Sequence, residues 1–142
     1  MRELAYIVVH CSDSPNDLND SRNDGAGDIH RWHIERGFAG IGYHYVIDEN
    51  GDTTPGRPVF TDSQDYWAGA HAKGHNDHSI GICLIGRSVF HATQLNALRK
   101  QIQFLKRIWP DAQVVGHRDL DGKKTCPNFN VKTWLTTGRI DP

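Results

Sequence analysis

The stretch Ser79-Ile80-Gly81-Ile82-Cys83-Leu84-Ile85 decides the fold of this 142-residue chain. A run this apolar is typical of a strand that is buried on both faces, as strands of helix-covered parallel sheets are. Two further apolar runs, at 5–10 and 112–116, are predicted to be strands as well. The core of the protein is therefore expected to contain a sheet built from segments that are distant in sequence.

A hairpin is predicted next to these strands. Tyr43-His44-Tyr45-Val46-Ile47 has a strand pattern, and Asp48-Glu49-Asn50-Gly51 is a turn signal that leads into a return strand at Thr53 and Thr54. The chain length fits one domain, so we expect a single α/β domain over residues 1–142.

Three segments have helical periodicity. They lie near 28–36, from about 93 to 109, and from about 131 onward, and the second carries a stripe of apolar residues every three or four positions. N-caps are predicted at Thr93 and Asn130, and helix ends at Gly37 and before Pro110. Strands and helices thus alternate along the chain.

Composition excludes some classes of partner. A net charge of −1 gives no basic footprint for nucleic acid, and no apolar stretch approaches the roughly 20 residues of a membrane span. No signal peptide is recognisable, so synthesis in the cytoplasm is expected. Three cysteines cannot form a complete disulfide framework, and Cys11 and Cys83 are expected to be reduced thiols, with Cys11 not a metal ligand.

Two histidines and one cysteine carry the chemistry. His10 and His117 each close a predicted strand, and Cys126 follows His117 by nine residues. Ligand sites of open α/β sheets lie beyond the carboxyl ends of the strands. Three nitrogen and sulfur ligands without a fourth are typical of a catalytic zinc, whose remaining position holds water. We therefore expect one zinc ion per chain, bound by these three residues.

The loop 67–78 offers a rival set of ligands, His71, His75 and His78. Gly69 and Gly74 argue against the helix that would make these histidines converge, and a thiolate favours zinc more than loop histidines do. His71 is interpreted as a substrate-side residue, and His75 and His78 as exposed loop residues. The remaining histidines, at positions 30, 33, 44 and 91, are expected at the surface or the edge of the core.

Six motifs in order point to one family. They are His10-Cys11-Ser12, Gly42-Tyr43-His44-Tyr45, Gly69-Ala70-His71-Ala72, Asn76-Asp77-His78-Ser79-Ile80-Gly81-Ile82, Gly116-His117-Arg118-Asp119-Leu120 and Lys124-Thr125-Cys126-Pro127. From residue 5 to about 135 the chain resembles the zinc-dependent N-acetylmuramoyl-L-alanine amidases that share a fold with peptidoglycan recognition proteins. Among these it looks most similar to the single-domain lysozymes of T-odd coliphages.

The resemblance implies a central mixed β-sheet flanked by helices, with a zinc cleft on one face. It implies cleavage of the amide between the lactyl group of N-acetylmuramic acid and the L-alanine of the stem peptide. Tyr43 matches a tyrosine that donates or relays a proton, and Lys124 a lysine that stabilises the oxyanion. From loop position alone, Trp67, Lys73 and Asn76 are predicted to bind substrate with His71.

Two other functions remain open at this point. A peptidoglycan-binding module without catalysis has the same fold but typically lacks the complete ligand set. A cysteine hydrolase would use Cys126, His117 and Asp119 as nucleophile, base and orienting group. Whether Asp119 orients a ligand or caps a turn is not decided by the sequence.

The biological setting follows from the same resemblance. We expect a monomeric phage endolysin that is made in the cytoplasm and acts on peptidoglycan of the cell wall after release. A cytoplasmic amidase that recycles soluble muropeptides is the alternative.

Overall fold

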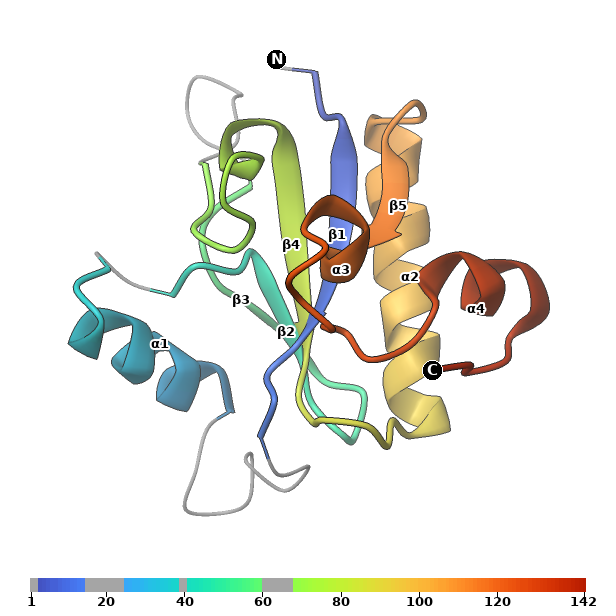
Figure 1. Ribbon diagram of the computed structural model, residues 1–142, viewed down its shortest axis with the longest axis horizontal. Helices are drawn as coiled ribbons and strands as arrows, with labels where there is room; N and C mark the ends of the chain where they lie inside the picture. The colour runs from blue at the N-terminus through green and yellow to red at the C-terminus, as the bar shows by residue number, and fades with distance from the viewer. Residues whose placement is uncertain (1–2, 15–24, 39–40, 60–67) are drawn as a thin grey trace.

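The sheet is built around β1 (Tyr6–Cys11), the strand that carries His10. The computed structural model describes residues 3–14, 25–38, 41–59 and 68–142 (Figure 1). The other strands are β2 (Tyr45–Ile47), β3 (Thr53–Pro55), β4 (Ser79–Leu84) and β5 (Gln113–Gly116), in the sheet order β3-β2-β4-β1-β5. The helices are α1 (Gly25–Glu35), α2 (Ala92–Ile108), α3 (His117–Leu120) and α4 (Val131–Thr137), and η1 (Asn76–His78) is a 3-10 turn.

The sheet is mixed, as predicted. β1 runs parallel to both of its neighbours, with Ile7 opposite Ile80 of β4 and Val114 of β5. β2 is parallel to β4, and only β3, the return strand of the hairpin, runs antiparallel. Because β1 and β5 point the same way, their carboxyl ends meet at one edge of the sheet, where His10 and His117 lie.

Alternate residues of β1 and β4 enter two different environments, since successive side chains of a strand point to opposite faces. We call the side that packs against α2 the core face, and the opposite side, with α1, the site face. The core-face residues of these strands are Ile7, Val9, Ile80, Ile82 and Leu84, which cluster with Leu98, Ile102 and Leu105 of α2. All six residues of β4 are buried, which confirms the strand predicted from the opening stretch.

The site face has a smaller apolar cluster. Cys83 of β4 and Val46 of β2 pack there with Ala26 and Ile29 of α1. The other residues of this face include His10, Ser79 and Gly81, which leaves a strip of polar side chains and glycine along β1 and β4. Figure 1 shows α2 behind β5 and α3 in front of β1, on opposite sides of the sheet.

The helix boundaries correct one prediction. α2 begins at Ala92 with His91 as its N-cap. The predicted cap, Thr93, lies two residues later, inside the first turn of the helix. The Thr93 hydroxyl donates instead to the carbonyl of Glu49 (2.9 Å), while the His91 amide donates to the side chain of Gln94 (3.4 Å). A tertiary contact thus takes up the side chain that the local pattern assigned to capping.

The other helix signals are confirmed. The side chain of Asn130 accepts from the amide of Thr133 and caps α4, and Gly37 follows α1 with a φ of +91°, a conformation that glycine adopts without strain. α3 and η1, each a single turn, were not predicted. Across the described residues, no helix is long and apolar enough to cross a membrane.

Candidate metal centre

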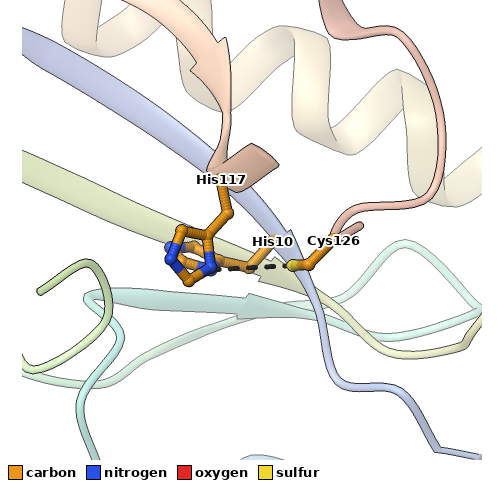
Figure 2. A group of neighbouring side chains, drawn as sticks. All are labelled: His10, His117 and Cys126. Atoms are coloured by element: carbon orange, nitrogen blue, oxygen red, sulfur yellow. Dashed lines mark hydrogen bonds between the residues drawn. The ribbon is translucent and has the colours of Figure 1, made fainter. Parts of the chain in front are cut away.

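Three elements bring the predicted ligands together. His10 lies at the end of β1, His117 is the first residue of α3 directly after β5, and Cys126 lies in the turn that follows (Figure 2). One ligand atom from each residue lies within 4.8 Å of the others. The imidazole rings of His10 and His117 have centroids 4.5 Å apart, and the Cys126 sulfur lies 3.8 Å from Nδ1 of His10.

These separations fit a zinc ion. Zinc–sulfur and zinc–nitrogen bonds of about 2.3 and about 2.0 Å, at a tetrahedral angle, place the two ligand atoms about 3.5 Å apart. The observed 3.8 Å between the Cys126 sulfur and His10 Nδ1 is close to that value. Two imidazoles and one thiol also form a donor set that zinc prefers. The three residues can therefore hold zinc with a fourth position left for solvent or substrate.

Two backbone amides, one from α3 and one from β1, donate hydrogen bonds to Cys126. The amide of Arg118 in α3 donates to the Cys126 carbonyl (2.8 Å), and the amide of Cys11 donates to the Cys126 sulfur (3.1 Å). The Cys126–Pro127 peptide bond is cis, and a Cβ on Gly116 would lie 2.9 Å from the Pro127 ring. Close packing between the end of β5 and this turn thus places the sulfur beside the two histidines.

The structure decides what Asp119 does. Its carboxylate accepts from the amide of Gly116 (2.8 Å) and so caps the single turn of α3. That turn presents His117 at its first position. Asp119 thus fixes the helix that carries a ligand, and its carboxylate is occupied by backbone rather than by an imidazole. This geometry does not favour a cysteine hydrolase with Asp119 as the orienting group.

Burial keeps the ligands neutral when no cation is bound. Burial, followed by the neighbouring His71 and His117, lowers the pKa of His10 well below its usual value. Burial and the charge of Lys124 lower the pKa of His117. The Cys11 side chain and burial raise the pKa of the Cys126 thiol. Because zinc ligands bind in their deprotonated forms, two ligands are ready to bind and the third must release its proton.

His71 lies behind His10 rather than in an open cleft. Its Nδ1 is 2.9 Å from Nε2 of His10, its Nε2 is 3.2 Å from the Ser79 hydroxyl, and the residue is 8% exposed. Burial, followed by the neighbouring His44 and His117, lowers the pKa of His71 to about 3. Both ring nitrogens are therefore engaged within the protein, and little of this side chain is available to a substrate.

Tyr43 and Lys124 lie near the ligands. The Tyr43 ring is 5.0 Å from the His10 ring, and burial raises the pKa of its phenol well above the usual value. Tyr43 is therefore a neutral phenol at neutral pH and can donate a hydrogen bond. Lys124 is exposed, two residues before Cys126, and its charge acts on His117. A positively charged side chain and a phenol thus lie near the three candidate ligands.

The remaining predicted substrate residues have different surroundings. Lys73 is exposed on the loop before η1, whereas the Asn76 side-chain oxygen accepts from the amides of His71 (2.8 Å) and Ala72 (2.9 Å). Trp67 lies outside the described residues. The fully buried His44, expected at the surface or core edge, accepts from the amide of Gly81 (3.1 Å). The local sequence carried no signal for the burial of His44 or for the contact between Ser79 and His71.

Fold and site together define a class, the α/β proteins in which two histidines and a cysteine that could hold a metal ion meet at the carboxyl edge of the sheet. The family model described as N-acetylmuramoyl-L-alanine amidase matches residues 1–129. The chain therefore belongs to the N-acetylmuramoyl-L-alanine amidase family, as the motifs indicated.

Individual relatives agree with this membership. The chain is 31% identical to the endolysin of Enterobacteria phage K11, over 98% of this chain and 90% of that protein. It is 33% identical to the endolysin of Escherichia phage T7, over 90% and 83%. Among solved structures, bumblebee PGRP-SA matches with a TM-score of 0.81 over 96% of this chain and 83% of that one, at 23% identity. The last likeness confirms the fold predicted from the resemblance.

Proposed function

We propose that this protein is a zinc-dependent peptidoglycan hydrolase. It cleaves the amide between the lactyl group of N-acetylmuramic acid and the L-alanine of the stem peptide. The observation that carries the proposal is the convergence of His10, His117 and Cys126 on one point, with ligand atoms within 4.8 Å of one another. Membership of the amidase family and the endolysin relatives support the bond that is cleaved.

Zinc at this position would supply a Lewis acid that acidifies a water molecule and polarises the scissile carbonyl. The protein's own residues then have three tasks. They hold the ion, supply a proton to the leaving nitrogen and stabilise negative charge on the carbonyl oxygen. His10, His117 and Cys126 serve the first.

Tyr43 is proposed to supply or relay the proton that the leaving nitrogen takes up. Its ring lies 5.0 Å from that of His10, and the phenol keeps its proton at neutral pH, so it can donate a hydrogen bond to the reacting amide and relay a proton there. The Tyr43 ring also packs against His33, with ring centroids 5.5 Å apart. These two ring contacts place the phenol beside the proposed metal ligands.

Lys124 is proposed to stabilise the oxyanion. Its ammonium group is positively charged, and the residue lies two positions before Cys126, at the end of the preceding turn. Lys73, on the exposed loop before η1, stays a predicted substrate contact. Trp67 and Asn76 stay predicted substrate contacts as well.

The proposed setting is that of a phage endolysin. The K11 and T7 endolysins match most of this chain, which supports synthesis in the cytoplasm and action on the cell wall after release. We expect the protein to act as a monomer, which sedimentation of the zinc-loaded protein can check. A cytoplasmic amidase that recycles soluble muropeptides is the alternative setting.

The proposal is tested by digesting purified sacculi and identifying the products by mass spectrometry. Release of stem peptides with a free L-alanine amino terminus, lost with a chelator and restored by zinc, is the expected result. Activity that withstands complete removal of metal would contradict it. Cleavage of soluble muropeptides but not of sacculi would instead favour the recycling role.

Two variants test the assigned roles. Tyr43→Phe removes the phenolic proton donor, and Lys124→Ala removes the cation, so each should lose about 100-fold or more in kcat while still binding zinc. Lys123→Ala, a neighbouring exposed lysine, is the matched control for Lys124. Retention of most activity in both variants would remove the two assignments.

A further inference from the structure

We infer that a hydrogen-bond chain from the carbonyl of His75 through Ser79 and His71 fixes His10 as the tautomer whose Nδ1 is free to bind zinc. The inference rests on the proposed zinc site and gives His71 a positioning role in place of substrate contact. It gives a structural role to Ser79 and His71, which take no direct part in the proposed reaction.

The direction of the chain follows from its end. A carbonyl can only accept, so the Ser79 hydroxyl, 2.6 Å away, must donate to the carbonyl of His75. With its proton committed, the Ser79 oxygen accepts from Nε2 of His71, at 3.2 Å. A neutral imidazole with a proton on Nε2 carries a lone pair on Nδ1.

The same logic reaches His10. Nδ1 of His71, now an acceptor, lies 2.9 Å from Nε2 of His10, which must therefore carry the proton. That leaves the lone pair of His10 on Nδ1, the atom 3.8 Å from the Cys126 sulfur. The nitrogen that faces the other two ligands is thus ready to bind a cation. Partners of this kind set the orientation and tautomer of metal-binding histidines in general.

The space around His71 is shaped for its ring. A Cβ on Gly81 would lie 2.6 Å from Nδ1 of His71, and a Cβ on Gly69 would lie 2.4 Å from its Cδ2. Contacts this short do not occur, so any larger residue at either position would displace the imidazole. The amide of His71 is held in addition by the Asn76 side chain (2.8 Å). Gly69, Asn76 and Gly81, which come from two of the motifs in the sequence, converge on one buried side chain.

The first experiment reads the tautomers directly in the metal-free, full-length protein. Nitrogen–proton correlations of the imidazole rings at neutral pH should show the proton on Nε2 in both His10 and His71. A proton on Nδ1 of His10 would overturn the inference, because the chain would then run the other way. This readout is independent of zinc and of catalysis, so it stands even if the proposed function fails.

The second experiment compares the zinc affinity of two variants. His71→Phe fills the space but accepts no hydrogen bond, so zinc affinity should fall by about 10- to 100-fold, the range for lost outer-sphere partners. His71→Asn places an amide oxygen near the position of Nδ1 and should restore affinity close to that of the unmodified protein. His75→Phe removes an imidazole from the same loop but keeps the carbonyl, and is the matched control.

The outcomes separate positioning from packing. Both His71 variants should lower the thermal unfolding midpoint of the metal-free protein, whereas only His71→Phe should weaken zinc binding in competition with a chromophoric chelator. A folded His71→Phe protein with unchanged zinc affinity, or a His71→Asn protein as weak as His71→Phe, would overturn the inference. Absence of zinc binding by the unmodified protein would count against the proposed function instead.

Discussion

The two faces of the sheet are made by alternate residues of the same strands, yet they are held together differently. On the core face, Ile7 and Val9 of β1 pack against apolar side chains of α2. Such packing depends on the shape and volume of the side chains and not on the direction of individual bonds. On the site face, His10 and Ser79 are buried just as deeply but meet their neighbours through directed hydrogen bonds. Buried polar groups need such partners, so one face supplies stability and the other supplies geometry.

The strongest test of this contrast is Cys126→Ser on the site face. A hydroxyl is a much poorer zinc ligand than a thiolate, so zinc affinity should fall by more than the roughly 100-fold that an outer partner can cost. Activity on sacculi should be lost with it. Metal content by atomic absorption checks the first result and turbidity loss of sacculi the second. Stoichiometric zinc in the variant would refute the ligand assignment.

Leu98→Ala is the matching change on the core face. Leu98 is fully buried under the sheet, and truncation of such a leucine costs about 2–5 kcal/mol of unfolding free energy. Urea unfolding of the metal-free protein measures this loss. The zinc affinity of the folded variant should be unchanged, because no bond to the ligands is touched. A zinc affinity that fell together with stability would mean that the two faces are coupled.

Low pH should destabilise the metal-free protein through the buried histidines of the site face. His71, with a pKa of about 3, and His10, with a pKa also far below 6.5, resist protonation in the folded protein. The unfolded chain takes up these protons below about pH 6.5, so metal-free stability is complete above that pH and declines as pH falls. By pH 5 one such histidine costs about 2 kcal/mol.

Urea unfolding at several pH values measures this decline. The Leu98→Ala variant serves as the reference, because its loss on the core face should add a constant amount at every pH. A metal-free protein as stable at pH 5 as at pH 7 would show that these histidines accept protons without disturbing the fold.

The smallest effect is expected at Asn130→Ala. The Asn130 side chain caps α4, whose Trp134 packs in the core-face cluster, and loss of such a cap costs about 1 kcal/mol. Thermal unfolding of the metal-free variant should show the change, and zinc affinity should not. Asn130→Ser, which keeps a capping oxygen, should recover most of the loss.

Much of the fold could be predicted because its signals are local. The apolar run 79–85 identified the central buried strand, and the turn signal at 48–51 identified the hairpin. The convergence of His10 and His117 followed from one topological rule, the common edge of parallel strands. Cys126 was assigned from ligand chemistry and from its motif, not from topology, and its position depends on a contact with the unpredicted turn α3.

The rest of the site could not be predicted because it depends on contacts across the fold. His10 and His71 are 61 positions apart, and nothing near either residue indicates that their rings share a hydrogen bond. Of the two glycines that make room for His71, Gly69 was interpreted only as a residue that opposes a helix, and Gly81 only as part of the buried strand. Likewise, Thr93 was assigned as a cap from local pattern, whereas its hydroxyl meets Glu49 from a distant hairpin.

The order of the ligands along the chain has a consequence for synthesis. β1 is made first, but it lies between β4 and β5, and the sulfur that completes the site belongs to residue 126. A growing chain can therefore bury its first histidine only after both neighbouring strands have been translated, and it can close around an ion only later still. A nascent chain that has not yet reached residue 126 therefore lacks a complete set of ligands, whatever ions surround it.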